Sequence, residues 1–171
     1  MIEVRHTTSA TPQAVFDVLT DGWLYASWVV GASRVRAVDD TWPAQGARLH
    51  HSFGLWPALI NDSTHVLSSV PGQRLVLQAR GWPAGEATVD IRLLPLDAAG
   101  GEGIGEGTNG AGGCVIVLGE DATKGPGRLV PPPLRKAALV VRNRETLRRL
   151  AMLAEGGAAR PHTHLSTEAP S

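Results

Sequence analysis

The order of the predicted secondary-structure elements limits the fold of this chain more than any other feature. Candidate strands follow one another with no long helix between them, and one long helix closes the series. The segment 87–93 alternates cleanly, with Thr88, Asp90 and Arg92 between apolar residues. This period of two predicts an antiparallel sheet with one buried and one solvent-exposed face. The buried face needs a covering layer, which only the long helix can provide.

The first strand is separated from the others by short helical segments. Thr11 fits the N-cap position and Pro12 the first helical position, so we expect a helix over 12–19. Residues 21–27 are predicted to form a second short helix or a turn. The candidate strands are 2–8, 33–39, 46–53, 60–70, 73–80, 86–96 and 114–120. In the strand 60–70 both faces contain polar residues, so its facing stays open.

The long helix is predicted over 134–155, roughly 33 Å at 1.5 Å per residue. Its apolar stripe has Asn143 near the centre and comprises Leu139, Val140, Leu147, Leu150, Ala151 and Ala154. The pattern therefore predicts an α+β fold with a curved antiparallel sheet of about six to seven strands wrapped around a long C-terminal helix. Residues 1–155 are expected to form this domain, with a mobile glycine-rich loop at 98–113 and a disordered tail at 156–171.

Charge and composition narrow the range of partners. Sixteen basic and sixteen acidic residues cancel, which argues against nucleic acid held by bulk charge. No apolar run reaches the ~18 residues of a membrane-spanning helix, and the N-terminus lacks the layout of a signal peptide. A single cysteine, Cys114, suits a reducing compartment. We therefore expect a cytoplasmic protein without integral membrane association, whose oligomeric state is open.

Several motifs resemble those of a known superfamily. They are Ala10-Thr11-Pro12, Trp28-Val29-Val30-Gly31-Ala32, Arg48-Leu49-His50-His51-Ser52, Gly81-Trp82-Pro83, Gly125-Pro126-Gly127 and Arg142-Asn143-Arg144-Glu145-Thr146-Leu147. Together with the element order, they are similar to a bacterial branch of the START-like SRPBCC superfamily (polyketide cyclase/dehydrase and lipid transport). The resemblance implies a helix-grip fold with a mostly apolar cavity between sheet and C-terminal helix. Its members bind lipids, sterols, polyketides, plant hormones or quinones, and some are enzymes that orient a polyketide for aldol closure and dehydration.

His51 is the candidate catalytic residue. Adjacent strand residues face opposite sides, and Leu49, His51 and Phe53 share the more apolar face, so His51 is predicted to point inward and His50 outward. An inward imidazole could act as a general acid/base near neutral pH, or it could only shape the pocket through hydrogen bonds.

The expected ligand-binding residues combine apolar and polar side chains. They are Trp28, His51, Leu75, Leu77, Trp82, Val89, Ile91, Asn143 and Leu147. Asn143 could donate to a ligand carbonyl or to a strand backbone. Trp28 and Trp82 could stack on a ligand at the pocket mouth or simply pack. Glu120 and Asp121 end the last predicted strand, where a carboxylate could reach the pocket mouth, but we interpret them as solvated charges at a strand end.

Other motifs do not indicate a bound cofactor or metal. The glycine pattern 105–110 precedes a strand, whereas a dinucleotide-binding loop precedes a helix. His162 and His164 lie in the predicted tail without a third ligand. The leading hypothesis is a protein that binds a small hydrophobic molecule, without metal or cofactor. The alternatives are a polyketide cyclase/dehydratase that uses His51, and a protein-interaction module without a ligand pocket.

Overall fold

The computed structural model describes residues 1–54, 59–81, 85–96, 112–124 and 132–158. Their element order is β1 (Ile2–Thr8), α1 (Pro12–Thr20), a 3-10 turn η1 (Gly22–Leu24), α2 (Tyr25–Trp28), β2 (Ala32–Val38), β3 (Arg48–Phe53), β4 (Ile60–Val70), β5 (Arg74–Gly81), β6 (Gly85–Pro95), β7 (Cys114–Lys124) and α3 (Pro132–Ala158).

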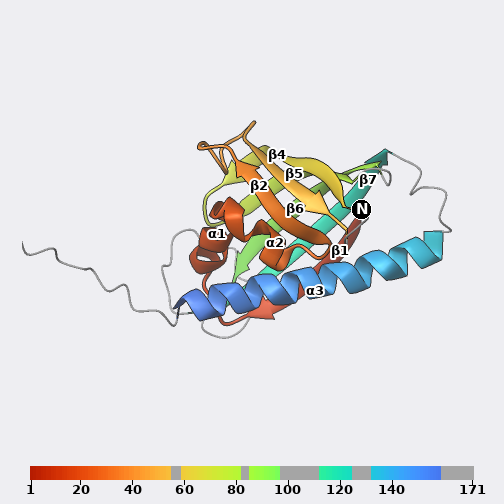
Figure 1. Cartoon of the computed structure of the whole chain (residues 1–171). Helices are drawn as coiled ribbons and strands as arrows, with labels where there is room; N and C mark the ends of the chain where they lie inside the picture. Colours follow the sequence, from red (N-terminus) through yellow and green to blue (C-terminus); the bar gives the residue numbers. More distant parts are fainter. Residues whose placement is uncertain (55–58, 82–84, 97–111, 125–131, 159–171) are drawn as a thin grey trace, which may run out of the picture.

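The strands form one seven-stranded antiparallel sheet in the order β1-β7-β6-β5-β4-β3-β2. From β2 to β7, each strand pairs with the next one in sequence. The exception is β1, which does not pair with β2 but with β7, the last strand. Figure 1 shows the curved sheet with α3 running across its open side, where α3 contacts β1, β7, α1 and α2. The predicted α+β helix-grip architecture is confirmed.

The first elements form as the local sequence predicts. β1 has the predicted bounds, and the Thr11 side chain accepts a hydrogen bond from the Ala14 amide at 3.2 Å, which caps α1. Pro12 occupies the first helical position without loss, since its missing amide hydrogen has no intrahelical partner there. The segment 21–27 becomes the turn η1 followed by α2.

Element ends depart from prediction where a partner extends or shortens them. β7 was expected to end at Glu120 but continues to Lys124, because β6 pairs with it as far as Glu86. β3 begins at Arg48 instead of residue 46, since Gly46 and Ala47 form the preceding turn. The long helix runs from Pro132 to Ala158, three residues into the segment predicted as tail. The predicted loop lies almost entirely outside the described residues, as does the tail from 159 onward.

The core lies between the concave face of the sheet and the helices. Burial alternates along β4, with Asp62, Thr64 and Val66 buried, which settles the facing that the sequence left open. On α3 the residues Leu147, Leu150, Ala151 and Ala154 are buried, as the apolar stripe predicted. The helices that the structure describes include none that is long and apolar enough to cross a membrane.

Candidate functional site

A hydrogen-bonded polar chain lies inside the apolar core, where α2 meets β3 and β4. The Nε2 atom of His51 is 3.2 Å from the Thr64 hydroxyl, which is in turn 3.1 Å from the Tyr25 hydroxyl. All of these side chains are at least nine-tenths buried. The pleat of β3 turns His51 inward, so this part of the sequence prediction is confirmed, whereas its proposed catalytic role stays a prediction.

Aromatic rings frame this chain. The Tyr25 ring packs against the His51 ring with centroids 5.1 Å apart, and meets the Trp28 ring edge-on at 5.3 Å. The buried Nδ1 of His51 and the buried Nε1 of Trp28 form no hydrogen bond of good geometry with the described residues, although the Ser52 backbone acts on the His51 ring. Buried polar atoms in native proteins normally have a partner, so a water molecule or a ligand atom is expected to meet these two nitrogens.

Burial controls the ionisation of His51 and Tyr25. Burial is the largest cause of the lowered pKa of His51. Arg36 and His50 add to the lowering, whereas the Asp62 carboxylate and a backbone hydrogen bond with Ser52 oppose it. The imidazole is therefore neutral near pH 7, with one nitrogen a donor and the other an acceptor. Burial likewise raises the pKa of Tyr25, so its hydroxyl stays protonated and able to donate a hydrogen bond.

A second polar group joins the sheet to α3. The buried Asn143 amide donates to the Glu120 carboxylate at 2.8 Å, and Arg142 forms an ion pair with the same carboxylate. The prediction that Glu120 is solvated is therefore wrong, because β7 extends past it and the pleat turns its side chain inward. Asn143 contacts a strand side chain instead of the strand backbone. Glu120 and Arg142 act electrostatically on Tyr25, so both polar groups share one region of the interior.

Most of the predicted ligand-binding residues come together on the concave side. The pairs Leu77–Val89 and Leu75–Ile91 are neighbours across β5 and β6. Leu75, Leu77, Ile91 and Leu147 are fully buried, whereas Val89 is half-buried. Trp82 lies outside the described residues. Trp28 is buried in the core, away from solvent.

Sequence reasoning missed a row of small residues beside the polar chain. Ala79 and Ala87 are paired across β5 and β6, and Ala79 also pairs with the buried Thr64. By parity they face inward like Leu77 and Val89, yet both alanines are only half-buried. The concave face is thus incompletely covered by the described residues at this end. The alternation at 87–93 could have predicted that Ala87 faces inward. Only the strand register shows that Ala79 lies beside it, with Thr64 next in the row.

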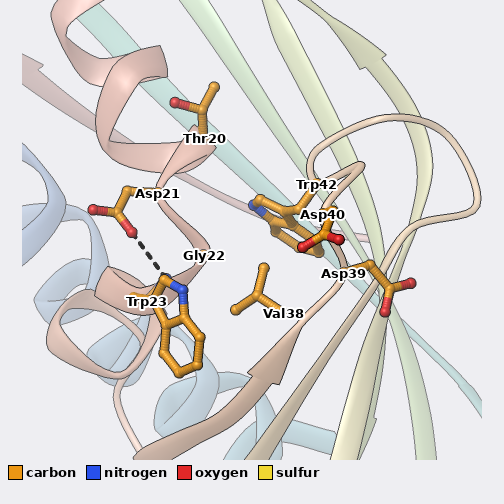
Figure 2. Close-up of a pocket in the computed structure, with 8 residues that line it drawn as sticks. All are labelled: Thr20, Asp21, Gly22, Trp23, Val38, Asp39, Asp40 and Trp42. Carbon is orange, nitrogen blue, oxygen red and sulfur yellow. Dashed lines mark hydrogen bonds between the residues drawn. The ribbon is translucent and has the colours of Figure 1, made fainter.

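A distinct pocket of about 360 Å³ lies on the outside of the domain, between the end of α1, η1 and the connection from β2 to β3. Figure 2 shows its lining residues, which are Thr20, Asp21, Gly22, Trp23, Val38, Asp39, Asp40 and Trp42. The residues predicted to bind a ligand are not among them. The sequence offered no signal for this pocket, because it joins segments that are apart in the chain.

Other candidate chemistry finds little support in the described part of the chain. Cys114 is buried in β7, and burial raises the pKa of its thiol to about 11, so the nucleophilic thiolate is disfavoured at neutral pH. The described residues contain no cluster of three or more histidine, cysteine, aspartate or glutamate side chains that could hold a metal ion.

Comparison with known proteins gives matches at the level of structure. No protein-family model and no curated protein sequence matches this chain. A Rhodobacter sphaeroides protein of solved structure is 20% identical with a TM-score of 0.64, covering 92% of each chain. The di-domain ARO/CYC protein StfQ from the steffimycin biosynthetic pathway is 14% identical, with a TM-score of 0.64 over 92% of this chain and 51% of its own. Ara h 8.0201 is 9% identical with a TM-score of 0.59, over 90% and 96%.

These likenesses agree with the geometry. A curved sheet, a long C-terminal helix laid across it and short helices after the first strand define the helix-grip fold of the START-like SRPBCC superfamily, and this chain has that fold. The chain spans about half of StfQ, and all three identities are below 25%, so the comparisons establish the fold alone.

Proposed function

We propose that the protein binds a small, mostly apolar molecule bearing a hydrogen-bonding oxygen, between the concave face of the sheet and α3. One observation carries this proposal. The half-buried, inward-facing Ala79, Ala87 and Val89 lie next to the buried polar chain of His51, Thr64 and Tyr25. The Nδ1 atom of His51, at the end of this chain, and the Nε1 atom of the neighbouring Trp28 ring form no hydrogen bond of good geometry with the described residues. Small side chains leave room for a ligand, and polar atoms without a well-formed hydrogen bond give it something to bind.

The chemistry of the lining favours a ligand with a carbonyl or hydroxyl group. The Trp28 indole can only donate a hydrogen bond, whereas the neutral His51 ring can donate or accept at Nδ1 according to its tautomer. Apolar ligand atoms would cover Val89 and the two alanines. The relation in fold to StfQ, named as an ARO/CYC protein, supports a polyketide-like or other aromatic ligand. The single cysteine, kept reduced, supports a cytoplasmic location.

Native mass spectrometry of freshly purified protein, followed by organic extraction, tests the proposal. We expect a stoichiometric apolar adduct, or 1:1 calorimetric binding of flat aromatic phenols to the empty protein. The variant Ala79→Leu should fill the site and weaken binding at least about tenfold, while Ala37→Leu, on the exposed side of β2, serves as the matched control. Absence of both adduct and phenol binding, or equal binding by Ala79→Leu and wild type, would contradict the proposal.

A second candidate function is a cyclase or dehydratase. The observation that favours it is the convergence of Tyr25 and Thr64 on His51, which supplies the second polar group that such chemistry needs. A neutral imidazole could remove a proton from the carbon beside a carbonyl while the Tyr25 hydroxyl stabilises the enolate oxygen.

Turnover of a poly-β-ketone substrate separates catalyst from carrier. We expect His51→Ala to lower kcat by about 10²–10⁴-fold and Tyr25→Phe to lower it less, with ligand affinity largely retained. His50→Ala, altered on the opposite face of the same strand, should leave turnover unchanged. Turnover that survives His51→Ala would remove this mechanism and leave ligand binding intact as a function.

A further inference from the structure

The external pocket has the size of a small-molecule site and is separate from the interior. Its volume of about 360 Å³ lies within the range of roughly 300–1,000 Å³ that ligand pockets occupy. Tyr25, Trp28, His51 and the other buried polar residues do not line it. Binding in this pocket is therefore independent of binding in the interior.

Its walls are aromatic and held in place. The Trp42 indole nitrogen donates to the Leu19 carbonyl at 3.1 Å, which fixes that ring against the end of α1. Trp23 is 61% exposed, an unusual state for the largest apolar side chain. Figure 2 shows the two indole rings on either side of Val38. A Cβ atom on Gly22 would lie 2.7 Å from Val38, so this close approach of η1 to β2 requires glycine.

The charged side chains that line the pocket are all acidic. Asp21 accepts a hydrogen bond from the Trp23 amide at 3.0 Å, and Asp39 accepts one from the Arg48 amide at 2.9 Å. Asp40 is exposed beside Trp42 (Figure 2). Within the described part of the chain, none of these carboxylates forms an ion pair with a basic side chain. The pocket thus combines uncompensated negative charge with aromatic faces.

The spacing of the carboxylates excludes a metal ion bound by all of them, since no three acidic side chains in the described residues are grouped closely enough to coordinate one. A larger cation with its charge spread over several carbons fits better, because indole faces attract such cations and carboxylates complement them at longer range. We propose that this pocket binds a small free alkylammonium ion, with Trp23 and Trp42 against its alkyl groups and Asp21 and Asp40 supplying the charge complement. For an open site, the expected dissociation constant is on the order of 1 mM.

The test is a titration of the ¹⁵N-labelled 171-residue chain followed by NMR. Choline is compared with 3,3-dimethyl-1-butanol, its neutral isostere, at constant ionic strength. We expect saturable shifts of the Trp23 and Trp42 indole N–H signals with choline and much weaker ones with the isostere. Butylammonium, a primary alkylammonium, should compete with choline for the site and shift the same indole N–H signals.

Variants locate the site. Trp23→Ala and Asp40→Asn change exposed side chains and should weaken choline binding at least about fivefold, with otherwise unchanged spectra. Asp121→Asn removes an exposed carboxylate on β7 and should leave the affinity unchanged. Equal binding of the neutral isostere would show an apolar site without cation selectivity and overturn the proposal. An absence of saturable shifts, or an unchanged affinity in both pocket variants, would overturn it as well.

Discussion

At the scale of single residues, His51 shows how burial changes the chemistry of a side chain. Exposed, this imidazole would titrate near pH 6.5. In the core it is held between the Tyr25 ring and the Thr64 hydroxyl, and burial lowers its pKa. Burial keeps the His51 ring neutral, which suits it to hydrogen bond with a neutral ligand. For the same reason, protonation of His51 destabilises the folded state.

The pH dependence of stability should reflect this. Because the folded-state pKa of His51 lies below the unfolded value, the unfolded state binds more protons, so stability falls as the pH drops below about 6.5. Each unit of pKa depression corresponds to about 1.4 kcal/mol. Urea unfolding between pH 5 and 8 should show a shallower loss in His51→Gln than in wild type. The pKa of His65 is also lowered, so the variant His65→Gln is measured in parallel to separate the contribution of His65 to the pH dependence from that of His51. Identical pH profiles for wild type and His51→Gln would contradict the assignment.

A glycine before β2 gives a second prediction at this scale. Gly31 has a φ of +102°, and a Cβ there would lie 2.3 Å from the Phe53 ring. Gly31→Ala should therefore cost about 1–3 kcal/mol of unfolding free energy, through backbone strain and displacement of the ring. Gly156→Ala is the control: it lies near the end of α3 with open space around it, so it should be neutral or stabilising by up to about 1 kcal/mol. Equal unfolding midpoints for the two variants would refute this account.

At the scale of elements, α3 is held to the rest of the domain by polar contacts as well as by its apolar stripe. Near its C-terminal end, Glu155 accepts hydrogen bonds from the Thr8 hydroxyl at 2.6 Å and from the amide and hydroxyl of Ser9 at 3.2 Å each. Closer to the middle of the helix, Asn143 and Arg142 contact Glu120 on β7. The two sets of contacts fix the position of the helix along the sheet.

A double-mutant cycle measures the contact at the helix end. Glu155→Gln and Thr8→Val should each destabilise by about 1 kcal/mol, with a coupling of about 0.5–1 kcal/mol in the double variant. The pKa of Glu155 is lowered chiefly by the Thr8 hydrogen bond, so the contribution is present above pH 4.5 and is lost as the pH falls through the folded-state pKa. Chemical denaturation at pH 7 and pH 3 checks both points. Additive effects of the two substitutions at pH 7 would show that the contact contributes nothing.

At the scale of the whole molecule, the fold joins distant parts of the chain. β1 pairs with β7 from Ile2↔Glu120 to Thr8↔Cys114, whereas neighbouring strands from β2 to β7 are consecutive in sequence. Long-range strand pairing makes folding slow, because loop-closure entropy is lost before the contacts form. We expect refolding on the scale of milliseconds to seconds.

Two core substitutions should separate early from late pairing. Val4→Ala on β1 and Leu77→Ala on β5 each remove buried apolar atoms and should destabilise by about 1–4 kcal/mol. In stopped-flow experiments, Val4→Ala should mainly speed unfolding, whereas Leu77→Ala, in the consecutive β5–β6 pair, should slow refolding. Slower refolding of Val4→Ala than of Leu77→Ala would indicate that the chain ends meet first.

The alternative of a protein-interaction module gains no support at this scale. The large apolar side chains exposed among the described residues are distributed over several elements, and they are Met1, Trp23, Leu59, Leu67, Val70, Val141 and Met152. Trp23 lines the external pocket, and the other residues in this list are scattered singly, as is usual at protein surfaces, so they do not mark a docking face.

The sequence by itself determined the elements and most of the facing within them. Alternation along strands gave the inward position of His51, the N-cap pattern gave the start of α1, and the helical stripe gave the buried residues of α3. These features follow from local periodicity and local hydrogen bonding, which a linear pattern records.

The tertiary structure alone decided which residues meet. Glu120 was expected in solvent but lies under Asn143 and Arg142, because the end of β7 depends on its partner β6. Tyr25, Thr64 and His51 come from separate segments, and only the register of β3 and β4 and the docking of α2 bring them together. The same holds for the pocket between Trp23 and Trp42. Local periodicity fixes the direction of a side chain relative to its own backbone, but its neighbours depend on strand register and packing between segments that the sequence does not align.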